Sequence, residues 1–387
     1  MINRFSPPPI HCQLWFANLR IPVVTSAIYH YSWRKKWGYT SDEFLQPYLI
    51  TCPIRPANSS TNRTLIPKSV SLIETYCSNA TNNLPIRYNQ QFITKKEDFA
   101  VCVKGLDFMH TDISVRLVEW IELLYILGVK KIFFYQFDVH PNISKVLNYY
   151  QSRQLVQVTK ISLPGTLPNL PGLRHSFLES HRPVKRQNEI IPYNDCLYNN
   201  LYSVQYIIPL DTDEIIIPLI HQDWSQLMTA VRKVSQTQEE SHYASYEVRS
   251  VYFFDDVNYN DTNKPSAANI SHTLGIPSYL HMLQHVYRSG TYLKVGWYAK
   301  SFFNTDHAVT IHNHILLNCF GRCTKYRINN TLAHVQHYRK DCVKELQKVC
   351  QNTYRKHILL DTSIWKYKAE SMQKTSNVLT QLGLLTL

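Results

Sequence analysis

Three acidic residues stand between two apolar runs near the middle of the chain, where they could bind a divalent cation. Asp211, Asp213 and Glu214 are preceded by Tyr206–Leu210 and followed by Ile215–Pro218. An apolar run of this kind predicts a strand buried on both faces, where an unpaired carboxylate is costly. Because Mn²⁺ and Mg²⁺ prefer oxygen ligands, a cation that carries a diphosphate would stabilise these carboxylates. A turn or a helix cap is the alternative interpretation of so short a motif.

Alternation along the expected strand indicates which carboxylates act together. Asp211 and Asp213 are two residues apart and should face one side, whereas Glu214 should face the other. A late histidine would complete the coordination sphere, because imidazole binds the same cations. The candidates are His312, which forms a His-x-His pair expected on one strand face, and His337. For the pair, a surface position or ordinary hydrogen bonding is the alternative.

Other polar side chains could bind further parts of a phosphorylated ligand. The guanidinium of Arg339 could hold a phosphate bidentately. Asn188, Asn194 and Asp195 lie on the helix expected before the acidic strand, where they could contact a sugar or a base edge. The alternatives are a surface arginine and, on the helix, caps or buried hydrogen bonds.

The elements around these residues alternate between strand and helix. The apolar spacing predicts strands at 99–103, 131–135, 155–159, 206–218, 244–254, 292–303 and 309–317, and helices at 113–127, 141–150 and 188–203. This order predicts an α/β fold with a largely parallel sheet. The acidic residues then lie at the carboxyl end of a strand, where open α/β sheets bind ligands.

Composition divides the chain into three expected parts. Residues 1–95 are rich in Pro, Ser, Asn and Cys and predict an irregular, partly disulfide-tied stem or β-rich cap. Residues 96–340 hold the α/β pattern, and residues 341–387 predict a charged helix and a loose tail. A hydrophobic fraction of 44% and a charged fraction of 18% are typical of globular proteins. The net charge of +13 suits a phosphorylated ligand, and the absence of a long basic block disfavours nucleic acid.

Cysteines and glycosylation sequons indicate a secretory-pathway lumen. The chain has nine cysteines without a Cys-x2-Cys pair, which argues against a zinc ribbon and leaves at least one thiol free or paired between chains. Seven Asn-x-Ser/Thr sequons occur, at Asn58, Asn62, Asn79, Asn142, Asn260, Asn269 and Asn329. The sequence has no run of 18 or more apolar residues and no N-terminal signal core, so it predicts no membrane span. The oligomeric state is not predicted.

Several short motifs together resemble the glycosyltransferase family 92 proteins of animals. They are Leu127–Tyr135, Pro192–Leu197, Leu210–Ile215 and the late His-x-His and His-Tyr-Arg elements, in the same order over roughly residues 90–340. The resemblance implies a GT-A type fold, a Rossmann-like nucleotide-sugar-binding domain with a mixed central sheet, preceded by the irregular N-terminal cap.

The resemblance also implies an activity and its cofactor. We expect an Asp-x-Asp-bound Mn²⁺, or Mg²⁺, and a UDP-sugar donor. The reaction would be inverting transfer of galactose from UDP-galactose to a glycan or glycoprotein acceptor, such as the fucose of an N-glycan core. Family members are generally held in the Golgi membrane by one N-terminal helix, facing the lumen, and this chain departs from them because no such anchor is visible.

An inverting transferase needs a general base on the acceptor side of the metal. Asp255 and Asp256, which follow an expected strand, are the candidates, with Glu247 as another. A turn formed by the Asp-Asp pair is the alternative.

Two other functions remain open at this point. One is a catalytically decayed, glycan-binding relative, and the other is a glycoside hydrolase that uses the carboxylates without a metal.

Overall fold

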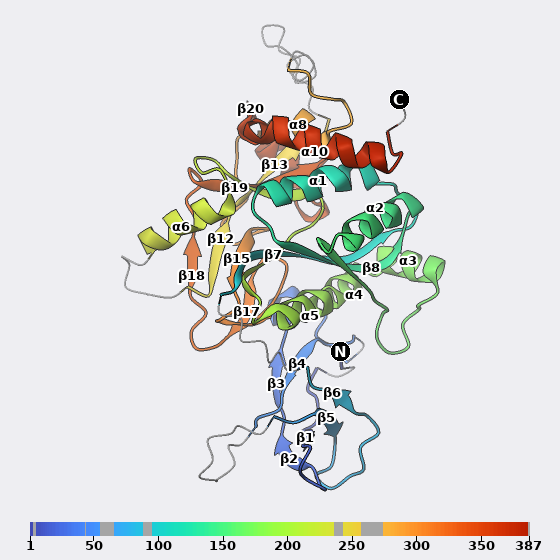
Figure 1. Ribbon diagram of the computed structural model, residues 1–387. Coiled ribbons are helices and arrows are strands. Elements are labelled where there is room, and N and C mark those ends of the chain that lie inside the picture. The colour runs from blue at the N-terminus through green and yellow to red at the C-terminus, as the bar shows by residue number, and fades with distance from the viewer. Residues whose placement is uncertain are drawn as a thin grey trace. The chain divides into compact units, whose positions relative to one another are not determined.

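The polypeptide forms two units that separate most of its N-terminal part from its α/β part (Figure 1). The computed structural model describes residues 1–2, 5–42, 44–54, 66–87, 95–235, 243–256 and 274–385. The first unit comprises Met1–Thr94 and His181–Asn188, and the second comprises Lys95–Ser180 and Glu189–Leu387. The acidic residues and the late histidines all belong to the second unit.

The first unit is built from short antiparallel strands. Its four-stranded sheet has the order β2-β1-β5-β6, and β3 pairs with β4. The bounds are β1 His11–Trp15, β2 Val23–Ser26, β3 Ile28–Tyr31, β4 Tyr48–Thr51, β5 Ser69–Ile73 and β6 Leu84–Pro85, with the 3-10 helix η1 Lys35–Trp37 and the helix α4 Arg182–Asn188. A disulfide joins Cys12 to Cys52, and Cys77 is free and exposed.

A seven-stranded mixed sheet forms the centre of the second unit. Its order is β18-β12-β15-β10-β7-β8-β9, in which β10, β7, β8 and β9 run parallel and β15 is antiparallel to β10 and β12. The bounds are β7 Glu97–Phe108, β8 Lys131–Val139, β9 Val156–Lys160, β10 Val204–Pro209, β12 Ser245–Val248, β15 Lys300–Asn304 and β18 Lys325–Arg327. The predicted mixed α/β fold with a mixed central sheet is therefore confirmed.

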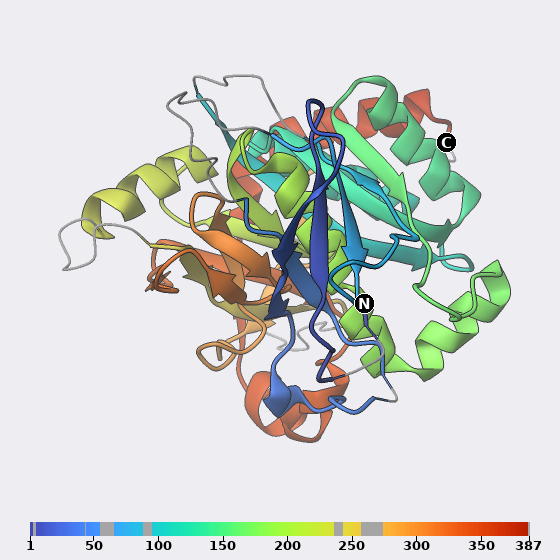
Figure 2. The ribbon, with the colours of Figure 1, turned by 90° about the horizontal axis from the view of Figure 1, so that it is seen from below.

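Helices cover both faces of this sheet. Helices α1 (Ser114–Ile126), α2 (Pro141–Ser152) and α10 (Lys368–Gln381) lie on one face, and α5 (Ile190–Asn200) lies on the other (Figure 1). Helix α6 (Trp224–Ser235) lies at the opposite end of this unit from α2 and α3 (Pro171–Ser180) in both ribbon views (Figures 1 and 2). Cys102 of β7 is joined to Cys196 of α5 by a disulfide.

A five-stranded sheet of order β11-β19-β13-β14-β20 completes the second unit. Its strands are β11 Glu214–Pro218, β13 Ser250–Phe254, β14 Tyr287–Ser289, β19 Ala333–Arg339 and β20 Ile358–Leu360. The remaining elements are the hairpin of β16 Ala308–Ile311 and β17 Leu316–Cys319, and the short helices α8 His281–Gln284, η2 Lys344–Leu346, α9 Gln347–Val349, η3 Cys350–Tyr354 and η4 Ser363–Tyr367. Disulfides also join Cys319 to Cys323 and Cys342 to Cys350.

Five sequence-based expectations were wrong in detail. The expected strand at 292–303 begins only at Lys300, as β15, because residues 292–299 form turns and irregular backbone. The expected strands at 206–218 and 244–254 are each two strands, because their halves pair in different sheets. The expected helix at 188–203 is α5, which begins at Ile190 after the separate helix α4. The expected strand at 309–317 is the hairpin of β16 and β17. Among the described residues, no helix has both the length and the apolar character needed to span a bilayer.

Candidate active site

The acidic residues form a turn between the two sheets of the second unit. Strand β10 ends at Pro209 in the seven-stranded sheet, and β11 begins at Glu214 in the five-stranded sheet. Glu214 N donates to Asp211 O at 3.0 Å, and Asp211 N donates to Glu214 Oε2 at 3.1 Å. Because the turn replaces a continuous strand, Glu214 does not face away as expected. One ligand atom each of Asp211, Asp213 and Glu214 lie within 4.8 Å of one another.

Two lysines from the seven-stranded sheet neutralise the carboxylates of Asp211 and Glu214. Lys104 Nζ of β7 is 3.2 Å from Asp211 Oδ1. Lys300 Nζ of β15 is 2.6 Å from Glu214 Oε2 and 3.6 Å from Asp211 Oδ2, and its side chain has no exposed area. Asn313 Nδ2 donates to Asp211 Oδ2 at 3.3 Å and Asn313 Oδ1 accepts from Lys300. Sequence reasoning missed these partners, although a lysine inside an apolar strand indicates a buried ion pair.

The lysines decide which carboxyl groups are ionised. Burial by itself would raise the pKa of Asp211, but the ammonium groups of Lys104 and Lys300 hold that pKa well below its usual value. Burial raises the pKa of Glu214, and the charge of Lys300 only partly opposes this. Burial and the charge of Lys300 also lower the pKa of His314 well below its usual value, so this imidazole is neutral at neutral pH.

Asp213 has a different environment from Asp211. Its side chain is 40% exposed, and its Oδ2 lies 3.4 Å from His337 Nε2 and 3.6 Å from Arg339 NH1. His337 and Arg339 are alternate residues of β19, so both can face the same carboxylate. Burial would raise the pKa of Asp213, but His337 lowers it, so the carboxyl is ionised at neutral pH. The structure thus brings together four predicted residues, Asp211, Asp213, His337 and Arg339.

This donor set fits a divalent cation of the Mn²⁺ type. Asp213 offers a partly exposed carboxylate, and His337 offers an imidazole on the same side. His337 Nδ1 is buried without a hydrogen-bond partner among the described residues, and lies 3.6 Å from Glu214 Oε1. Mn²⁺ accepts carboxylate oxygen together with imidazole nitrogen, as this pair would supply.

The other predicted metal ligand, His312, lies in the turn between β16 and β17. Its Nδ1 accepts a hydrogen bond from His314 N at 3.3 Å, so the His-x-His segment is a turn and not the expected strand. His314 Nδ1 is 3.0 Å from Ala299 O, and the charge of Asp211 acts on His314. His314 is therefore within electrostatic reach of Asp211.

The three polar residues predicted to contact the nucleotide have partners inside the protein. Asn188 ends α4 of the first unit, and its Nδ2 donates to Val184 O. Asn194 bonds both N and O of Ile311 through its amide, which ties α5 to β16. Asp195 Oδ2 accepts from the hydroxyl of Tyr135 at 2.5 Å and from an asparagine one turn later on the helix. Asn188 is buried and Asn194 is half-buried, so their contacts match the alternative of buried hydrogen bonds, whereas Asp195 is exposed.

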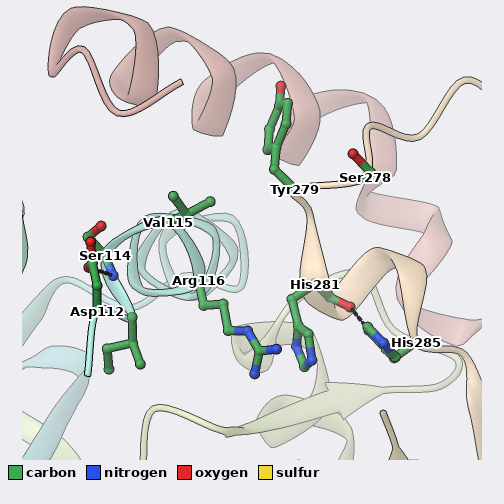
Figure 3. A pocket seen from close by; sticks show the side chains of 9 residues that line it. Asp112, Ser114, Val115, Arg116, Ser278, Tyr279, His281 and His285 are labelled. Atoms are coloured by element: carbon green, nitrogen blue, oxygen red, sulfur yellow. Dashed lines mark hydrogen bonds between the residues drawn. The ribbon is translucent and has the colours of Figure 1, made fainter. Parts of the chain in front are cut away.

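The three predicted base candidates differ in position. Asp255 follows β13, and its Oδ2 lies 3.1 Å from His281 Nε2. Asp256 pairs with Arg355 at 2.8 Å and is largely exposed. Glu247 is buried in β12 and pairs with Lys325 at 2.9 Å, which indicates a structural role. Asp255 contacts His281, which lines a pocket between α1 and α8 (Figure 3).

A comparison with known protein families shows the class of this chain. The model of the family described as "Glycosyltransferase family 92" matches residues 97–375, which span the acidic turn, both lysines and β19. The second unit is therefore a glycosyltransferase. More narrowly, the chain belongs to glycosyltransferase family 92, as its motifs indicated.

A curated relative and two solved structures show lesser similarity. Beta-1,4-galactosyltransferase galt-1 of Caenorhabditis elegans is 28% identical over 146 residues, which are 36% of this chain and 31% of the relative. The chain thus covers about a third of that protein. S. aureus TarS and the bifunctional glycosyltransferase WbbM each give a TM-score of 0.23 at 10% identity. The matches cover 43% and 58% of this chain and 23% and 34% of those chains.

Proposed function

We propose that this protein is a metal-dependent, inverting glycosyltransferase of GT-A type that transfers galactose from UDP-galactose to a glycan. The fucose of an N-glycan core is the proposed acceptor. Membership of family 92 supports the transferase class, and the name of the nematode relative supports galactose. The observation that carries the proposal is the exposed carboxylate of Asp213 between His337 and Arg339 at the edge of the five-stranded sheet.

Asp213 and His337 would hold the cation in this proposal. A bound Mn²⁺ or Mg²⁺ supplies neutralisation of the charge on the diphosphate leaving group. Arg339 shares that task, because a guanidinium beside Asp213 can bind a phosphate oxygen pair. Lys104 and Lys300 hold Asp211 and Glu214 in place. Of the three acidic residues, Asp213 alone would then face the substrate.

The same proposal places the protein in the lumen of the secretory pathway, in the Golgi. Four disulfides join eight of the nine cysteines, and disulfides persist in oxidising compartments. Attachment to the Golgi membrane through a single N-terminal helix, as in the family, is part of the proposal, and the described residues contribute no such helix.

A calorimetric titration tests the proposal directly. UDP should bind the wild-type chain in the presence of Mn²⁺, and UDP-galactose should be turned over with a glycan acceptor. Asp213→Asn should abolish Mn²⁺-dependent UDP binding with little change in thermal unfolding, because this side chain is partly exposed and its ion pairs are longer than the buried pair of Lys300 and Glu214.

The outcomes separate the alternatives. A wild-type chain that binds glycan but not UDP with Mn²⁺ would be a catalytically decayed relative. A chain that cleaves glycosides in EDTA would be a hydrolase. Full turnover by Asp213→Asn would remove the metal-site assignment. An Asp306→Asn variant is a matched control, because Asp306 is also an exposed aspartate in an ion pair, with Lys96.

A further inference from the structure

We propose that Asp255, His281 and His285 form a Zn²⁺-binding site that is separate from the donor site. This site is additional to the proposed transferase function and does not depend on it. One ligand atom of each of the three residues lies within 4.8 Å of the others. Two imidazoles and one carboxylate are a donor set that Zn²⁺ accepts in proteins, with a water molecule in the fourth position.

The two histidines are one helical turn apart on α8. His285 N donates to His281 O at 3.1 Å, and the centroids of their rings are 4.2 Å apart. Residues at positions i and i+4 share one face of a helix, which is the spacing of histidine pairs that bind zinc. The sequence alone did not mark this pair as a site, because its third ligand is on a strand.

The carboxylate of Asp255 approaches these rings from the end of β13. Its Oδ2 lies 3.1 Å from His281 Nε2. Two ligands that are each about 2.0–2.1 Å from a tetrahedral ion are about 3.3 Å from one another. The oxygen and the nitrogen therefore already have nearly the separation that coordination of one ion requires.

The ligand atoms of Asp255 and His281 lack hydrogen bonds that would compete with a cation. The side chain of His281 is 8% exposed, and its Nε2 has no hydrogen-bond partner among the described residues. Asp255 Oδ1 is also buried without such a partner in this part of the chain. Buried polar atoms without partners are unfavourable, and a cation bound between these side chains would stabilise both.

The ring of His285 is held in the tautomer that a metal ligand requires. Its Nδ1 lies 2.7 Å from His281 O, as the dashed line in Figure 3 marks. Because a carbonyl oxygen can only accept, Nδ1 carries the proton and Nε2 keeps its lone pair. Histidines that bind metals commonly donate their second ring N–H to a carbonyl or carboxylate in this way.

The proposed zinc site and the donor site are on opposite faces of the five-stranded sheet. The ring of Tyr338 packs against His281 at a centroid distance of 5.7 Å. Its neighbours on β19, His337 and Arg339, contact Asp213 instead. Successive residues of a strand face opposite sides of the sheet. Cation binding at the two sites can therefore be measured independently.

A pocket between α1 and α8 gives a cation access to the histidines. Its volume is about 360 Å³, and both His281 and His285 line it. Figure 3 shows Arg116 and His281 extending from α1 and α8 in the same direction. The carboxylate of Glu119 accepts two N–H groups of α8 and so fixes the turn that carries the histidines. The pocket provides the entry path and the space for a water ligand that such a site needs.

Arg116 opposes a cation at this site and so gives a prediction of opposite sign. Its NH1 lies 3.7 Å from Asp255 Oδ2, where its charge repels the ion. The side chain is 56% exposed, so the guanidinium can turn into solvent when the ion binds. Arg116→Gln should therefore tighten Zn²⁺ binding by up to about fivefold, the range for an exposed ion pair.

Equilibrium dialysis against Zn²⁺, after treatment with EDTA, tests the site in the full chain. Every protein carries Asp213→Asn, which removes the exposed carboxylate of the donor site. We expect this chain to bind one Zn²⁺, and His281→Gln or His285→Gln to weaken binding by about 100-fold or more, since loss of an outer partner alone costs about 10–100-fold. His357→Gln, at an exposed histidine, is the matched control and should bind as before. Co²⁺ in place of Zn²⁺ should show the visible absorption of a four-coordinate ion, which His281→Gln should abolish.

Other outcomes would overturn the inference. They are no stoichiometric Zn²⁺ binding by the Asp213→Asn chain, undiminished binding in both histidine variants, and weaker binding in Arg116→Gln. If His281→Gln does not fold, His285→Gln, whose side chain is half-buried, and Arg116→Gln still decide between a metal site and a structural cluster. Failure of the wild-type chain to bind UDP with Mn²⁺ would refute the proposed function and leave the zinc site standing.

Discussion

At the residue scale, Asp211 and Asp213 are two positions apart but have separate roles. Asp211 is 19% exposed and contacts Lys104, Lys300 and Asn313. Asp213 is 40% exposed and contacts only His337 and Arg339 in the described ion pairs. We infer that Asp211 stabilises the turn and that Asp213 presents an oxygen to the substrate side.

Lys300 should contribute strongly to stability. Lys300→Met keeps the approximate length of the side chain but leaves Glu214 and Asp211 without their shared ammonium group. Removal of one partner from a buried ion pair costs about 3–5 kcal/mol, so the free energy of unfolding in urea should fall by that amount. Lys233→Met on α6 is the matched control at an exposed lysine. An equal, small effect of both substitutions would contradict the assigned role.

Residue types alone identified part of the site. Asp211, Asp213, His337 and Arg339 could be predicted because carboxylate, imidazole and guanidinium groups suit a cation and a diphosphate. The lysines could not be predicted in the same way. Their roles depend on carboxylates that are distant in sequence, such as Asp211 for Lys300.

At the element scale, the short helix α8 depends on a contact from α1. Glu119 is fully buried, and its carboxylate oxygens accept hydrogen bonds from Met282 N and Leu283 N at 3.0–3.1 Å. Four residues are too few for a helix that is stable alone, so this carboxylate holds α8 against the sheet. The position of His281 therefore follows from a side chain more than 160 residues earlier.

Glu119 should make stability depend on pH. Burial raises its pKa from 4.5 to about 7, although the N–H groups of Met282 and Leu283 oppose the shift. Since the folded-state pKa is the higher one, the contribution of Glu119 is fully present below pH 4.5 and is lost as the pH rises to 7. The loss is on the order of 3 kcal/mol.

Glu119→Gln isolates this effect, because a glutamine oxygen can still accept the two N–H groups and does not titrate. The quantity to measure is the unfolding free energy of the variant minus that of the wild type, determined in urea at several pH values. It should rise by about 3 kcal/mol between pH 4.5 and 7. Glu345→Gln on η2 is a control on another helix. A difference that does not vary with pH would contradict the raised pKa.

Apolar periodicity predicted the elements that bury one side against a single sheet. The order β7-α1-β8-α2-β9 follows from apolar periodicity, because each element buries one side against the same sheet. The break at Asp211–Asp213 was predicted as part of one strand, since residues on both sides are equally apolar and buried. The two halves differ only in their pairing partners. Strand β10 pairs with β7 and β15, whereas β11 pairs with β19.

At the scale of the whole molecule, the disulfides and sequons point to the same compartment. Cys102 and Cys196 join a central strand to the helix beneath it, and the other three disulfides join segments within each unit. The sequons at Asn79 and Asn329 are on exposed residues. Asn142 is different, because its amide donates to Asp112 Oδ2 at 2.6 Å in the first turn of α2. The other four sequons lie outside the described residues.

We expect glycans on Asn79 and Asn329 when the protein is made in a secretory pathway. Asn79→Gln and Asn329→Gln should each increase gel mobility by one step, because an exposed acceptor asparagine is accessible to the transferase that modifies it. Asn142→Gln is the matched control and should have no effect on mobility. Treatment of the wild-type protein with a glycosidase that releases N-glycans should also shift the band. An unshifted band would favour a cytosolic protein over the luminal one proposed.

The turn at Asp211–Asp213 has a mechanical consequence, because it belongs to neither sheet. Its inner carboxylates are anchored to lysines of the seven-stranded sheet, while Asp213 contacts the end of a strand in the five-stranded sheet. A cation bound there would connect the two sheets to each other. Binding at the donor site and the rigidity of the junction between the two sheets would then be coupled. Greater mobility at this junction would therefore weaken nucleotide binding.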